Sequence, residues 1–187
     1  MCNKRLAVLF GSPSRHGNTG RLLDSFLAGL PAGIEAEIAS AYEWNMAPCR
    51  GCGFCREHQG CALPDFPRFD ALLRGADYLA VATPVYNLSF PAPLKAMLDR
   101  TQCYYNARFC RGIRPPLPKR KPAVLLVTAD GQGQEGVAIM ERQLNMIFTI
   151  LNAELVWTVR ALGTGQHPVG AAEQELAAQA ARKLLLP

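Results

Sequence analysis

The sequence predicts an α/β fold with a doubly wound, five-stranded parallel sheet and helices on both faces. Two observations predict it. First, short apolar runs alternate with segments of helical periodicity along the 187 residues, and this alternation is typical of parallel βαβ units. Second, 49% of the residues are hydrophobic and only 19% are charged. A chain of this length and composition can bury a substantial core.

The strands and helices are expected in strict alternation. The expected strands are Leu6–Phe10, Ile34–Ile38, Tyr78–Ala82, Ala123–Thr128 and Leu155–Val159. The expected helices are Gly20–Leu30, Phe66–Arg74, Ala92–Thr101, Glu135–Leu151 and Ala171–Leu185. Gly75 follows the second helix, and Pro91 and Pro93 open the third. Since no repeat or low-complexity tract interrupts this order, residues 1–187 are expected to form one domain.

The loop after the first strand is polar and leads directly into a helix. It reads Gly-Ser-Pro-Ser-Arg-His-Gly-Asn-Thr over residues 11–19. Such a loop directs free backbone N–H groups and the positive end of the helix dipole at one point, which favours a phosphate. Hydroxyl and amide side chains add neutral donors, and Arg15 can add charge. The expected phosphate-binding residues are Ser12, Ser14, Arg15, Gly17, Asn18 and Thr19. No Gly-Lys-Ser/Thr follows, so the loop is not a Walker loop.

Two more loops are expected at the same edge, because ligands of such sheets bind at the carboxyl ends of the strands. Thr-Pro-Val-Tyr-Asn (83–87) follows the third strand. There Pro84 stiffens the turn, and Val85, Tyr86 and Asn87 offer backbone N–H groups beside an aromatic ring. That combination suits a flat heteroaromatic ring. After the fourth strand, Asp130 and Gly131 face the same edge. On the helix that follows the 83–87 loop, Lys95 and Asp99 are four residues apart and can pair.

Together these loops resemble the NADPH-dependent FMN reductase family of flavodoxin-like proteins, over about residues 4–160. The resemblance implies a flavodoxin-like domain with strand order 2-1-3-4-5. It implies that the 12–19 loop holds the FMN phosphate and that the 84–87 loop holds the isoalloxazine edge. Asp130 and Gly131 would close the other side of the ring. Because the flavin itself accepts hydride, no catalytic acid or base is assigned.

Four cysteines lie within thirteen residues, in the loop 45–65 after the second strand. Cys49, Cys52, Cys55 and Cys61 have the spacing C-x2-C-x2-C-x5-C, with glycines at 51, 53 and 60 that let the backbone wrap closely. The tight triplet suits iron–sulfur better than zinc, and it resembles the iron–sulfur flavoprotein branch of the family, which implies one [4Fe–4S] cluster. Many members of the family carry two aspartates after the last cysteine, whereas only Asp65 stands here. Bare thiols, zinc and a disulfide remain open. Cys2, Cys103 and Cys110 are interpreted as structural or incidental thiols.

The segment 103–121 is interpreted as an insertion between the third helix and the fourth strand. It holds six basic and no acidic residues between Arg108 and Lys121, and prolines 115, 116 and 118 indicate irregular chain. The net charge of the chain is +5. The basic segment could attract NADPH or an acidic ferredoxin-like carrier. Members of the family form homodimers or homotetramers, and Tyr104, Tyr105 and Phe109 are candidates for that contact.

Several other classes of protein are disfavoured. The start of the chain shows no signal peptide, and no apolar stretch is long enough to span a bilayer, so a cytoplasmic protein is expected. Gly131–Gly136 reads GxGxxG, but too little chain follows for a Rossmann half. None of the cysteines has an arginine six residues later, as a phosphatase loop requires. Nucleic-acid binding would rest on the basic segment alone.

Two functions remain after these exclusions. In the first, the protein is an oxidoreductase in which FMN passes electrons from NAD(P)H or a reduced carrier to a small acceptor such as a quinone or flavin. In the second, it is a non-enzymatic iron–sulfur/FMN protein that relays electrons between protein partners.

Overall fold

The computed structural model describes residues 4–131 and 133–184. Its centre is a parallel sheet of five strands in the order β2-β1-β3-β4-β5. The strands are β1 (Lys4–Phe10), β2 (Ile34–Ser40), β3 (Tyr78–Pro84), β4 (Lys121–Ala129) and β5 (Ala153–Leu162). The predicted α/β class and strand order are therefore confirmed.

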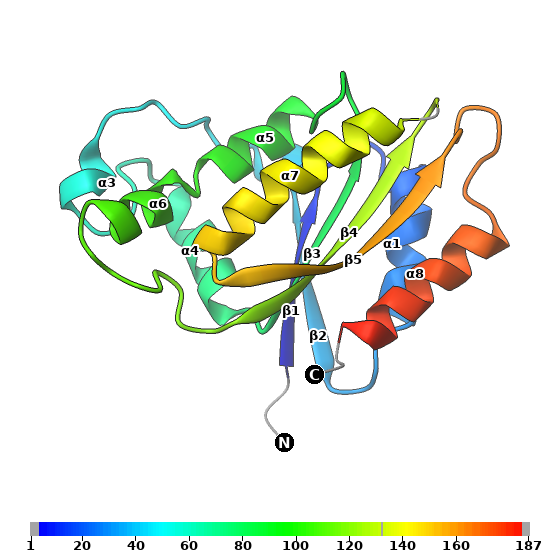
Figure 1. Ribbon diagram of the computed structural model, residues 1–187, viewed down its shortest axis with the longest axis horizontal. Helices are drawn as coiled ribbons and strands as arrows, with labels where there is room; N and C mark the ends of the chain where they lie inside the picture. The colour runs from blue at the N-terminus through cyan, green and yellow to red at the C-terminus, as the bar shows by residue number, and fades with distance from the viewer. Residues whose placement is uncertain (1–3, 132, 185–187) are drawn as a thin grey trace.

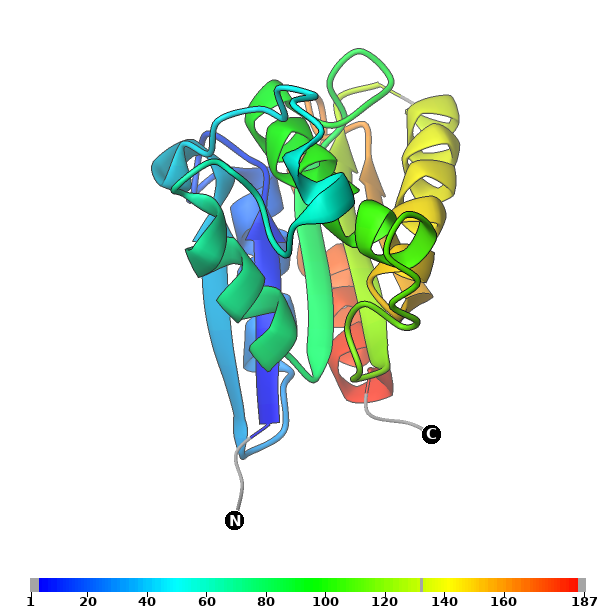
Figure 2. The same ribbon diagram turned by 90° about the vertical axis from the view of Figure 1, so that its left-hand side faces the viewer.

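Helices cover both faces of this sheet (Figures 1 and 2). One face carries α1 (Asn18–Ala28) and α8 (Ala171–Lys183). The other carries α2 (Ala41–Trp44), α4 (Phe66–Gly75), α5 (Ala92–Asp99), α6 (Gln102–Phe109) and α7 (Gln134–Ile150). The short α3 (Phe54–Glu57) lies beside α6 (Figure 2). Along β1, alternate side chains enter the two cores: Ala7 and Leu9 one, and Leu6, Val8 and Phe10 the other. Burial of both faces explains why the strands read as continuous apolar runs.

The five predicted helices are present, with ends that differ by a few residues from the sequence pattern. Pro91 caps α5, and Pro93 lies in its first turn, as predicted. Leu185, the predicted end of the last helix, and Cys2 lie outside the described residues. The segment 103–121 differs from expectation at its start, because α6 extends over Gln102–Phe109 before the irregular, proline-containing chain begins. Helix α6 is stabilised by burial of Cys103, Tyr104 and Ala107, which the basic composition of the segment conceals.

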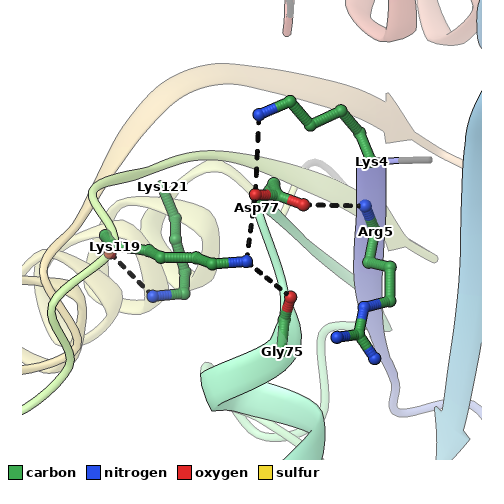
Figure 3. Close-up of polar contacts among 6 residues, drawn as sticks. All are labelled: Lys4, Arg5, Gly75, Asp77, Lys119 and Lys121. Carbon is green, nitrogen blue, oxygen red and sulfur yellow. Dashed lines mark hydrogen bonds and ion pairs between the residues drawn. The ribbon is translucent and has the colours of Figure 1, made fainter. Parts of the chain in front are cut away.

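A polar cluster lies at the amino-terminal edge of the sheet (Figure 3). The Asp77 carboxylate accepts a hydrogen bond from the Arg5 N–H at 3.0 Å and another from Lys119 Nζ at 3.2 Å. Lys4 Nζ lies 3.7 Å from the same carboxylate. Lys119 also donates to the carbonyl of Gly75 at 3.1 Å, and Lys121 Nζ donates to the carbonyl of Lys119 at 2.7 Å. This edge thus joins β1, β3 and β4, and Lys119 of the basic segment links them.

Candidate functional site

A pocket with a volume of about 470 Å³ opens at the carboxyl-terminal edge of the sheet. Its walls come from the loops after β1, β3, β4 and β5. The residues that line it are Ser12, Pro13, Ser14, Asn18, Thr19, Pro84, Val85, Tyr86, Asn87, Thr128, Ala129, Asp130 and Thr164. The three loops singled out in the sequence therefore meet at one pocket, on the edge where the fold places ligands.

The first loop presents backbone N–H groups to this pocket. Helix α1 begins after Gly17 without a side-chain cap, so the first N–H groups of the helix lack intrahelical acceptors. The helix starts very close to the loop, because a Cβ on Gly20 would lie 1.7 Å from the carbonyl oxygen of Arg15. Ser12 Oγ donates to the Ser14 carbonyl at 3.1 Å and accepts from the Ser14 N–H at 3.2 Å. This is the geometry of an anion site at a helix N-terminus.

The Asn18 and Thr19 side chains fasten this loop to the rest of the edge. Asn18 Nδ2 donates to the carbonyl of Thr164 at 3.2 Å, and its Oδ1 accepts from the Val169 N–H at 3.0 Å. The Oγ1 atoms of Thr19 and Thr128 lie 2.7 Å apart in a buried hydrogen bond. Both residues line the pocket, and both also hold its walls in place.

Arg15, which was expected to supply charge to the phosphate, pairs with another residue in this structure. Its guanidinium pairs with the carboxylate of Asp24 and lies 3.3 Å from the carbonyl oxygen of Gly20, on the outside of α1. Arg15 does not line the pocket, and among the described residues that do, Asp130 is the charged one. Gly17 is likewise not a lining residue; it precedes the first residue of the helix. An anion at this site would be held by N–H and hydroxyl groups rather than by a cation.

The loop after β3 ends in a tight turn. Tyr86 and Ser89 exchange two N–H···O bonds of 2.9 Å, and Asn87 and Leu88 between them have φ angles of 48° and 61°. The Val85 N–H donates to the carbonyl of Thr128 at 2.8 Å. The expectation that Val85 and Tyr86 offer free N–H groups is therefore wrong, because the turn and β4 use them. Within the described residues, Asn87 is the member of this trio whose N–H has no acceptor. The Tyr86 ring lines the pocket and is 45% exposed.

The loops after β4 and β5 are tied together at the far wall. Thr164 donates through its N–H at 3.0 Å and its Oγ1 at 3.2 Å to the carbonyl of Ala129. The Gly131 carbonyl accepts from the Gly163 N–H at 2.9 Å, and Gly131 itself is not a lining residue. Sequence reasoning missed Pro13, Thr128, Ala129 and Thr164. The rule that directs attention to the carboxyl ends of the strands would have found Thr164 if it had been applied to β5 as well.

The four clustered cysteines line a second pocket of about 210 Å³. Gln102 and Asn106 of α6 form its other wall. Cys49 and Cys52 are exposed, and Cys55 and Cys61 are half-buried. The glycines at 51, 53 and 60 all have positive φ, a backbone conformation that glycine adopts readily. Among the described residues, no group of three His, Cys, Asp or Glu side chains is positioned to hold a single metal ion.

The two inner cysteines accept hydrogen bonds from nearby side chains. Asn106 Nδ2 donates to Cys55 Sγ at 3.1 Å, and Arg100 Nη2 donates to Cys61 Sγ at 3.4 Å. Cys103 lies in the core, and its burial, together with the neighbouring Cys55, raises the pKa of its thiol. Cys110 is exposed and donates to Asn106 Oδ1 at 3.6 Å. Four thiols on one pocket wall, with N–H donors at two of them, form a ligand set suited to an iron–sulfur cluster.

The basic residues of the segment 103–121 divide into two groups. Lys119 and Arg120 pair with Asp77 and Glu154 outside the segment, and the buried Lys121 donates to the Lys119 carbonyl within it. Arg108, Arg111 and Arg114 have no acidic partner in the part of the chain that the structure describes. Nearby on α6, Tyr105 and Phe109 are exposed with ring centroids 4.5 Å apart.

Comparison with known proteins gives a family and a fold. The model of a family described as NADPH-dependent FMN reductase matches residues 4–166. The chain is 31% identical over 99 residues to an iron–sulfur flavoprotein of Methanosarcina thermophila, covering 52% of each protein. It is 30% identical over 139 residues to an iron–sulfur flavoprotein of Archaeoglobus fulgidus, which covers 73% of this chain and 60% of that protein. The matches thus span between half and three-fifths of these relatives.

Solved structures share the fold over nearly the whole chain. An NAD(P)H:quinone oxidoreductase from Methanothermobacter marburgensis superposes with a TM-score of 0.67 at 24% identity, covering 96% of this chain and 92% of that one. An azoreductase from Bacillus anthracis gives a TM-score of 0.67 at 18% identity, covering 96% and 99% of the two chains. No helix among the described residues has the length and apolar character that a bilayer crossing requires.

Proposed function

The chain belongs to the NADPH-dependent FMN reductase family, and we propose that it transfers electrons from NAD(P)H or a reduced carrier through FMN to a small acceptor such as a quinone or flavin. The observation that carries this proposal is the 470 Å³ pocket at the carboxyl edge of the sheet. Its anion-binding loop lies on one side and its exposed tyrosine on the other. A phosphate and a flat ring of one ligand fit these two features.

The residues of the pocket would bind and orient the flavin. The hydroxyls of Ser12 and Ser14 and the first N–H groups of α1 would bind the phosphate. Pro84, Tyr86 and the Asn87 N–H would hold the ring on one side, and Asp130 with Thr164 would close the other. When bound, FMN supplies the hydride-accepting ring, so the protein needs only to orient it and exclude competing reactions. No side chain of the pocket is assigned as a catalytic acid or base.

A [4Fe–4S] cluster on Cys49, Cys52, Cys55 and Cys61 is the second part of the proposal. The thiols share one pocket, and the matched iron–sulfur flavoproteins support this assignment. Such a cluster would supply one-electron transfer. Because thiolate ligands persist in a reducing compartment, this part also favours the cytoplasm. The non-enzymatic electron carrier is the alternative that the cluster would favour.

The test is to purify the protein without oxygen and to measure its absorption spectrum, iron, acid-labile sulfide and NADPH oxidation. We expect flavin absorption, about four irons per chain and NADPH oxidation that depends on an added quinone. Flavin and iron with no pyridine-nucleotide oxidation would select the electron carrier. Flavin without iron would leave a reductase with bare thiols. Colourless protein that does not take up FMN would contradict the whole proposal.

We further propose that Arg108, Arg111 and Arg114 attract NADPH or an acidic ferredoxin-like carrier, because their charges are unpaired within the described residues. We propose a homodimer or homotetramer contact at the neighbouring aromatic rings of Tyr105 and Phe109. Tyr104, the third residue expected there, is buried in the core and is not available for such a contact. Replacing the three arginines by alanine is expected to weaken at least one of the two affinities tenfold or more at low salt. Tyr105→Ser/Phe109→Ser is expected to reduce the mass measured by light scattering. Unchanged affinities or an unchanged mass would contradict the corresponding assignment.

A further inference from the structure

The cysteine-bearing segment 47–65 has its two ends joined at one buried side chain, Arg100. Arg100 Nη1 donates to the carbonyl of Ala47 at 2.7 Å. The Asp65 carboxylate accepts from Nη2 at 2.7 Å and from Nη1 at 3.2 Å, and also from the Ala47 N–H at 2.8 Å. The Arg100 side chain is 0% exposed, and that of Asp65 is 28% exposed. Four hydrogen bonds therefore close this segment at its base.

Arg100 and the nearby Asn106 of α6 also donate hydrogen bonds to two of the cysteine sulfurs in the segment. Arg100 Nη2 also contacts Cys61 Sγ at 3.4 Å, and Asn106 Nδ2 contacts Cys55 Sγ at 3.1 Å. The Cys110 thiol donates a hydrogen bond to Asn106 Oδ1 and so helps to orient the Asn106 amide. In the described part of the chain, Cys49 and Cys52 receive no such hydrogen bond and are exposed. The cysteines thus form an inner pair with donors and an outer pair without them.

We propose that Arg100 and Asn106 are positioning residues of the cysteine loop. Arg100 holds the loop closed before any metal enters, and the two residues donate hydrogen bonds to the sulfurs of Cys61 and Cys55 when a cluster is bound. The second half rests on the proposed cluster, and the first half does not. N–H donors to ligand sulfurs stabilise the added electron of a reduced cluster, so they raise its reduction potential. Asp65 acts here as the ion-pair partner of Arg100.

The test compares Arg100→Met, Arg100→Lys and Asn106→Leu with Arg120→Met, a control that removes an exposed arginine paired with Glu154. In the metal-free chain, amide hydrogen exchange of residues 47–65 is expected to become about tenfold faster or more in Arg100→Met. Arg100→Lys is expected to restore part of this protection. The control is expected to exchange like the wild type. Asn106→Leu, which loses only the hydrogen bond to Cys55 Sγ, is expected to exchange more slowly than Arg100→Met.

In anaerobically reconstituted protein, the midpoint potential of the cluster is measured by a redox titration monitored by electron paramagnetic resonance. Arg100→Met and Asn106→Leu are each expected to lower it, and Arg120→Met is not. Unchanged exchange in Arg100→Met would overturn the closure of the loop. Unchanged potentials in Arg100→Met and Asn106→Leu, with full iron content, would overturn the role at the sulfurs. Wild-type protein that takes up no iron would overturn that role and the proposed cluster together, whereas the exchange experiment would still decide on loop closure.

Discussion

Lys121 is a fully buried lysine whose charge opposes folding. It lies at the start of β4, and its Nζ donates to the Lys119 carbonyl at 2.7 Å. Burial, with a smaller effect of the nearby Lys119 charge, lowers the pKa of Lys121 to about 8. The unfolded chain, with a lysine pKa of about 10.4, binds the proton more tightly than the folded chain. Stability from this group should therefore rise between pH 8 and about pH 10.4 and stay flat below pH 8.

Lys121→Met is expected to remove this rise and to increase the free energy of unfolding at pH 7 by about 1–3 kcal/mol. Urea denaturation at several pH values between 7 and 10.5 measures both effects. Lys95→Met, which removes an exposed lysine paired with Asp99, is the control and should keep the rise. If Lys121→Met showed the pH dependence of the wild type, the charge of Lys121 would have no part in it.

Substitutions of Arg15 and Gly20 are expected to affect FMN binding to the phosphate loop differently. Arg15 is engaged by Asp24, so Arg15→Met is expected to change the dissociation constant of FMN by less than about threefold. A Cβ on Gly20 would collide with the Arg15 carbonyl, so Gly20→Ala must displace the loop or the helix. We expect FMN to bind about tenfold more weakly or worse in Gly20→Ala. Fluorescence titration with FMN measures both dissociation constants. If Arg15→Met weakened FMN binding more than Gly20→Ala did, Arg15 would be a phosphate-binding residue.

At the scale of elements, the turn at 86–89 stores backbone strain beside the candidate flavin pocket. Leu88 has a φ of 61° and a side chain that is 45% exposed, and a β-carbon at positive φ costs about 1–2 kcal/mol. Leu88→Gly is expected to increase the free energy of unfolding by about 0.5–1 kcal/mol after the greater chain entropy of glycine is subtracted. Leu88→Ala keeps the β-carbon and serves as the control in urea denaturation. A destabilised Leu88→Gly would show that packing of the leucine outweighs the strain.

The sequence was sufficient to predict elements whose signals are local. The apolar run before Gly11, the prolines at 91 and 93 and the cysteine spacing each identify their own segment, and the strand order followed from the family resemblance. The acceptors of individual hydrogen-bond donors were not predictable, because they lie on other parts of the chain that only the fold brings close. The Val85 N–H is used by Thr128, and the Arg15 guanidinium is used by Asp24. Helix α6 was missed since its apolar face packs against elements far away in the sequence.

At the scale of the whole molecule, the two edges of the sheet have different tasks. At the amino-terminal edge, the polar groups bind one another. The Asp77 carboxylate accepts from the Arg5 N–H and from Lys119, and Lys119 also donates to the Gly75 carbonyl. The carboxyl-terminal edge has an open pocket, which is lined by the start of α1, whose first N–H groups lack intrahelical acceptors. Polar groups that have no partner in the fold are available to a ligand, so binding at this edge should add to the stability of the entire chain.

This coupling gives a prediction for the stability of the molecule as a whole. FMN at about one hundred times its dissociation constant should stabilise the folded chain by about 2.7 kcal/mol. In a chain of this size, that free energy raises the melting temperature by roughly 5–10 °C. Riboflavin, which lacks the phosphate, leaves the N–H groups at the start of α1 without their ligand. At equal concentration it should give less than about half of the shift in differential scanning calorimetry. Equal shifts for the two flavins would contradict the assignment of the phosphate to the 12–19 loop. No shift with either flavin would contradict the assignment of the pocket as a flavin site.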